Sequence, residues 1–91
     1  MSEEQIEILN KLVQKYGDKQ ITICIEEMSE LTKELCKNIR GHYNLNNIYE
    51  EMADVYITLT QMQILFGMDV EVLEDMINKK IQRAKERLLW K

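Results

Sequence analysis

The chain has 91 residues and a formal net charge of -4, which is enough for one small domain over residues 1–91. It contains no proline and three glycines, a composition that favours long uninterrupted helices. The net negative charge disfavours electrostatic binding of nucleic acid or of an anionic membrane over a broad surface. The sequence has no apolar run of about eighteen residues and no signal-peptide core, so we expect a cytoplasmic protein without a membrane span.

Hydrophobic periodicity and helix-stop signals predict four helices. Ser2 is expected to cap the first helix, Asn44 or Asn46 the third, and Asp69 the fourth. Short connections favour antiparallel neighbours, so we expect an all-α fold, a four-helix bundle built on a helical hairpin. The expected helices cover residues 1–16, 18–40, 45–66 and 70–88.

The expected third helix is apolar over most of its circumference, and three other short helices can hardly cover it within one chain. The bundle is therefore expected to be completed by packing in a homodimer or a homotetramer. Trp90 is expected to pack on a partner or to stay partly exposed. Cys24 and Cys36 lie on one expected helix at a separation of about 18 Å, too far for a disulfide, so we expect reduced thiols.

Two acidic pairs lie inside otherwise apolar helical patterns. Glu27 with Glu30, and Glu51 with Asp54, are each spaced three residues apart, which places each pair on one side of its helix. Antiparallel packing of the two helices would bring the pairs together as a cage of four carboxylates. Oxygen ligands without histidine or cysteine suit Mg²⁺ or Mn²⁺ better than Zn²⁺.

Other interpretations of these residues stay open. A single acidic pair is also typical of a solvated helix face, and the chain would then be a non-catalytic helical oligomerisation or interaction module. The only histidine, His42, falls in a loop, which disfavours a ferritin-like di-iron site. A nucleic-acid binder using the basic segment 79–91 is disfavoured by the acidic total.

The two acidic segments together resemble a known family. Residues 26–31 and 50–55 are similar to the patterns E-E-x-x-E-L and E-E-h-x-D-V of the MazG-like all-α nucleoside triphosphate pyrophosphohydrolase superfamily. The resemblance implies Mg²⁺ as cofactor, with Mn²⁺ as a substitute, and outer-shell or water-orienting roles for Glu26 and Glu50. The metal-binding and catalytic residues that it implies are Glu27, Glu30, Glu51 and Asp54.

The resemblance also implies a reaction, which is cleavage of a (d)NTP or related nucleotide between the α- and β-phosphorus to monophosphate and pyrophosphate. Such an enzyme would serve nucleotide-pool house-cleaning. Related proteins carry K-x-x-x-N-x-x-R on the last helix as phosphate contacts. Here Lys80 and Arg87 match, Ala84 replaces the asparagine, and Lys79 with Arg83 is a competing pair.

Overall fold

The computed structural model describes residues 1–89 and contains four α-helices and no strand within that range. The prediction of an all-α chain with four helices is confirmed, whereas Trp90 lies outside the described residues. None of the helices in residues 1–89 is long and apolar enough to cross a membrane. The helices are α1 (Glu3–Tyr16), α2 (Lys19–Ile39), α3 (Leu45–Leu65) and α4 (Val70–Leu89).

The helix ends follow local side-chain chemistry. Ser2 Oγ accepts a hydrogen bond from the Gln5 backbone N–H at 3.1 Å, and Gln5 Oε1 accepts one from the Ser2 N–H, which completes a capping box. Gly17 separates α1 from α2 with a φ of 54°, a conformation that glycine adopts readily. Asp69 caps α4 as predicted. Asn44 occupies the N-cap position of α3 without a capping bond, because its side chain is bonded to α2 instead.

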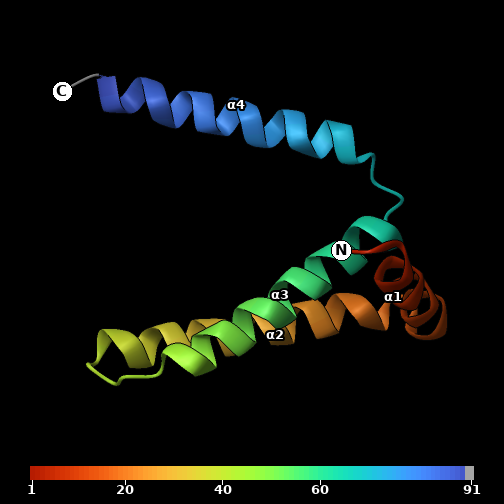
Figure 1. The fold of residues 1–91 in the computed structure, drawn as a ribbon, viewed down its shortest axis with the longest axis horizontal. Helices are drawn as coiled ribbons and strands as arrows, with labels where there is room; N and C mark the ends of the chain where they lie inside the picture. The colour runs from red at the N-terminus through yellow and green to blue at the C-terminus, as the bar shows by residue number, and fades with distance from the viewer. Residues whose placement is uncertain (90–91) are drawn as a thin grey trace.

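Three of the helices pack together and the fourth does not (Figure 1). The antiparallel hairpin of α2 and α3 makes the most extensive contact, and α1 packs against both near the end where α3 finishes. After the turn that follows α3, α4 leads away and runs back beside the hairpin as a separate arm. The single chain is therefore open, with extents of 49 × 35 × 23 Å and a radius of gyration of 16.2 Å.

The interior is small and largely polar. Within the described residues, the buried apolar side chains are limited to Leu9, Val13 and Cys24. Much of the apolar surface of the hairpin faces outward instead. The buried polar side chains are Gln20, Glu34, Thr58 and Gln61.

The contact between α2 and α3 follows two sets of side chains spaced by seven residues, which is close to two helical turns. At the closed end, Asn44 Nδ2 donates to the Glu34 backbone carbonyl and to Glu34 Oε2, both at 2.8 Å. Seven residues further along each helix, Glu27 lies near Glu51. The two pairs are Glu34 of α2 with Asn44, the N-cap residue of α3, and Glu27 of α2 with Glu51 of α3.

Candidate metal centre

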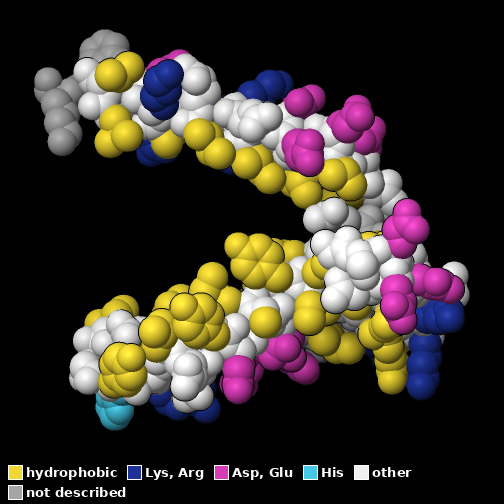
Figure 2. Space-filling model, viewed as in Figure 1, with side chains coloured by type: hydrophobic (Ala, Val, Ile, Leu, Met, Phe, Trp, Pro, Cys, Tyr) yellow, Lys and Arg dark blue, Asp and Glu magenta, His cyan; other side chains and the backbone are white. Residues whose placement is uncertain are grey.

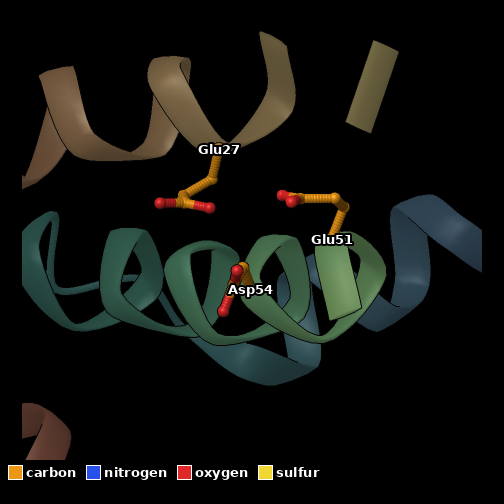
Figure 3. A group of neighbouring side chains, drawn as sticks. All are labelled: Glu27, Glu51 and Asp54. Carbon is orange, nitrogen blue, oxygen red and sulfur yellow. The ribbon is translucent and has the colours of Figure 1, made fainter. Parts of the chain in front are cut away.

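Three carboxylates meet between α2 and α3 (Figure 3). Glu27 projects from α2, and Glu51 and Asp54 project from α3. Each residue offers one oxygen, and these three oxygens all lie within 4.8 Å of one another. The spacing of three residues puts Glu51 and Asp54 on one side of α3, and the hairpin register supplies Glu27 from across the seam.

The three carboxylates repel one another in a partly desolvated position. Glu27 and Glu51 are half-buried and Asp54 is exposed. Partial burial raises the pKa of Glu27 above its ordinary value, and the charges of Asp54 and Glu51 raise it further. Partial burial also raises the pKa of Glu51, followed by the charges of Asp54 and Glu30. The folded chain therefore holds negative charge where it is unfavourable.

No basic side chain among residues 1–89 relieves this charge. The ion pairs in that range are Lys11 with Glu7 and Lys37 with Glu34, and both lie outside the cluster. Clustered carboxylate oxygens are the donor set that Mg²⁺ and Mn²⁺ prefer, and such ions keep further positions for water and substrate phosphates. The donor set therefore fits a divalent cation of this class.

The other acidic residues expected at the site lie around the cluster rather than in it. Glu30 is one turn beyond Glu27 on α2, is exposed, and is not among the three converging carboxylates. Its charge nevertheless raises the pKa of both Glu27 and Glu51. Glu26 and Glu50 are also exposed. The structure therefore gathers three carboxylates where four were expected.

Glu34 is a structural part of the site that the sequence patterns missed. It is 8% exposed, and Asn44 and Lys37 hold its carboxylate, the latter at 3.3 Å. The hydrogen bond from Asn44 lowers the pKa of Glu34, in contrast to Glu27. The sequence feature that could have identified Glu34 was its position seven residues after Glu27. Glu34 fixes the end of the hairpin and thereby the register that sets Glu27 opposite Glu51.

The predicted phosphate contacts are not assembled with these carboxylates. They lie on α4, which has no extensive contact with the hairpin and no buried residue in the described chain (Figure 1). All of them are exposed, and none forms an ion pair within residues 1–89. These residues are Lys79, Lys80, Arg83 and Arg87.

Comparisons of the chain with protein-family models, with curated proteins and with solved structures found no match. The convergence of Glu27, Glu51 and Asp54 is therefore the main observation on which a function can rest. Three carboxylate oxygens gathered in this way are a donor set of the kind that Mg²⁺ or Mn²⁺ prefers.

Proposed function

We propose that this chain is a Mg²⁺-dependent nucleoside triphosphate pyrophosphohydrolase of the MazG-like type. Its substrate would be a (d)NTP or a related nucleotide, cleaved between the α- and β-phosphorus to the monophosphate and pyrophosphate. The observation that carries the proposal is the convergence of Glu27, Glu51 and Asp54 within 4.8 Å. Mn²⁺ would substitute for Mg²⁺, because both prefer oxygen ligands.

Glu27, Glu51 and Asp54 would hold the ion, which neutralises phosphate charge and lowers the pKa of a bound water. Glu30 is exposed one turn along α2, so its side chain can rotate toward the cluster as a fourth ligand or as a base. In the reaction, the water oxygen bonds to one of the two bridged phosphorus atoms and the bond to the bridging oxygen breaks. The proton of the water would pass to a carboxylate; attack at the α-phosphorus would expel pyrophosphate, whereas attack at the β-phosphorus would expel the monophosphate.

The substrate's phosphates also require cations from the protein. We assign this role to Lys79, Lys80, Arg83 and Arg87 on α4. Since α4 does not pack on its own hairpin, these side chains meet a nucleotide only when α4 moves or when a second copy presents its own α4. The assembly proposed is a homodimer or a homotetramer in the cytoplasm.

A second function is favoured by a different observation, the scarcity of buried apolar side chains. The chain would then be a non-catalytic helical oligomerisation module whose carboxylates are solvated. Thermal unfolding separates the two functions. A cation site gains stability by mass action in millimolar Mg²⁺, whereas a solvated acidic surface responds equally to monovalent salt of the same ionic strength.

The direct test measures pyrophosphate release from a panel of standard and modified (d)NTPs with Mg²⁺. We expect Glu51→Gln and Asp54→Asn to reduce the rate by at least about a hundredfold, because each removes a charged ligand. Glu4→Gln, an exposed change on α1 that likewise removes one negative charge, serves as the matched control. Full activity in both site variants would remove the proposed metal role.

A further inference from the structure

The single chain exposes far more surface than a compact chain of its size. Its accessible area is 7632 Å², whereas a compact monomer of 10.9 kDa exposes about 5,600 Å². The radius of gyration is 16.2 Å, compared with about 12 Å for a compact domain of this length. Each chain therefore carries about 2,000 Å² of surface that a compact fold would bury.

One part of this excess is the outward face of α3. Tyr49, Met52, Tyr56 and Leu59 follow one another at spacings of three or four residues, so they share a face. Tyr49 and Tyr56 are 65% and 64% exposed. The same spacing rule puts this face on the opposite side of α3 from Asp54. The face is continuous with a groove of about 270 Å³ lined by Leu31 of α2 together with residues of α3.

The other part is the apolar stripe of α4, formed by Val70, Ile77, Ile81, Ala84 and Leu88 at spacings of three, four or seven residues. Figure 2 shows apolar side chains along the edge of α4 that faces the hairpin and along the edge of the hairpin that faces α4. Most helical stability in proteins comes from tertiary packing of the amphipathic face, and α4 has no extensive packing of this kind within one chain. Both faces therefore need cover, and neither covers the other within one chain.

We propose that the α3 face and the α4 stripe are covered by a second copy of this chain, with α4 of each copy lying on α3 of the other. This inference takes the dimer from the proposed function and assigns its interface. A two-fold arrangement covers both faces in both chains at once, because each copy supplies what the other lacks. Two such excesses sum to about 4,000 Å², within the range of about 2,000 to 5,000 Å² that obligate dimers bury.

Sedimentation equilibrium and small-angle scattering of the full chain in EDTA test the interface without any nucleotide or metal. The expected mass is twice 10.9 kDa, or that of a tetramer built from such dimers. Tyr56→Glu and Ile81→Glu should each weaken association by at least about a hundredfold, because a two-fold interface contains each residue twice and each lost contact is worth about tenfold. Gln82→Glu introduces the same residue on the exposed side of α4 away from the stripe and should leave the mass unchanged.

A monomer with a radius of gyration near 12 Å would mean that α4 folds onto its own hairpin, and it would overturn the proposal. A monomer that keeps about 16 Å would also overturn it, because the two faces would then serve a different partner. Circular dichroism at high concentration distinguishes a dissociated variant from one that fails to fold. The experiment contains neither nucleotide nor Mg²⁺, so a negative result would overturn the proposed interface without bearing on the Mg²⁺-dependent reaction. The two proposals can therefore fail separately.

Discussion

Replacing Asp54 by asparagine should make the metal-free protein more stable and the Mg²⁺-loaded protein less stable than the wild type. The oxygens of Asp54 and Glu27 lie within 4.8 Å of each other, and two unit charges at that upper limit repel by about 0.9 kcal/mol in a water-like dielectric. Asp54→Asn removes this repulsion with Glu27 while keeping the shape of the side chain. A gain of about 1 kcal/mol corresponds to a melting temperature about 4 to 8 °C higher for a domain of this size.

In Mg²⁺ the order should reverse. At a concentration one hundred times the dissociation constant, the wild type gains about 2.7 kcal/mol, whereas a variant with a hundredfold weaker site gains only about 0.4 kcal/mol. Thermal melts in EDTA, in MgCl₂ and in NaCl of equal ionic strength measure both effects. The reasoning is refuted if the variant melts below the wild type in EDTA, or if Mg²⁺ stabilises both proteins equally.

Three further predictions concern the hairpin seam. The raised pKa values of Glu27 and Glu51 mean that the folded state binds protons more readily than the unfolded state. The free energy of unfolding of the metal-free protein should therefore rise as the pH falls from 7 toward 5. Urea unfolding in EDTA measures this change. A fall over that interval would contradict the assigned shifts. Asn44→Ala removes three side-chain hydrogen bonds to α2 and should cost about 1 to 3 kcal/mol in the same assay. An equal cost for the exposed control Asn46→Ala would refute that role. Gln20→Met replaces a buried amide whose oxygen has no hydrogen-bond partner, so stability should stay unchanged or rise by about 1 kcal/mol, and a clear loss would show that the amide is satisfied in solution.

The helices were predictable because their signals are local. Ser2 with Gln5, the break at Gly17, and Asp69 before α4 each act within a few residues, so the sequence alone locates these boundaries. The antiparallel meeting of Glu27 with Glu51 was also predictable, because a short connection allows little else. These features use information that lies within one helix or one turn.

The packing was less predictable because it depends on which face of each helix turns inward. Periodicity gives an apolar stripe on α2, yet Met28 and Leu35 are 41% and 45% exposed while Gln20 and Glu34 are buried. Asn44 was expected to cap the third helix, and its side chain instead forms hydrogen bonds to Glu34. Capping preferences describe bonds within the first turn of a helix, so they do not predict this bond to another helix. Exclusion of Glu30 from the cluster likewise depends on side-chain directions that spacing alone leaves open.

The polar seam and the exposed apolar faces have a common physical origin in α3. One side of this helix holds Glu51 and Asp54 against α2, so its large apolar side chains, such as Met52 and Tyr56, must point elsewhere. Clustered carboxylates weaken the hairpin, and a chain of 91 residues has little apolar core to offset them. Burying the outward face of α3 against a second copy would supply the missing stabilisation on the side away from Asp54, which leaves the carboxylates free to bind a cation. In the proposed arrangement the assembly would stabilise the fold and the carboxylates between α2 and α3 would bind the cation.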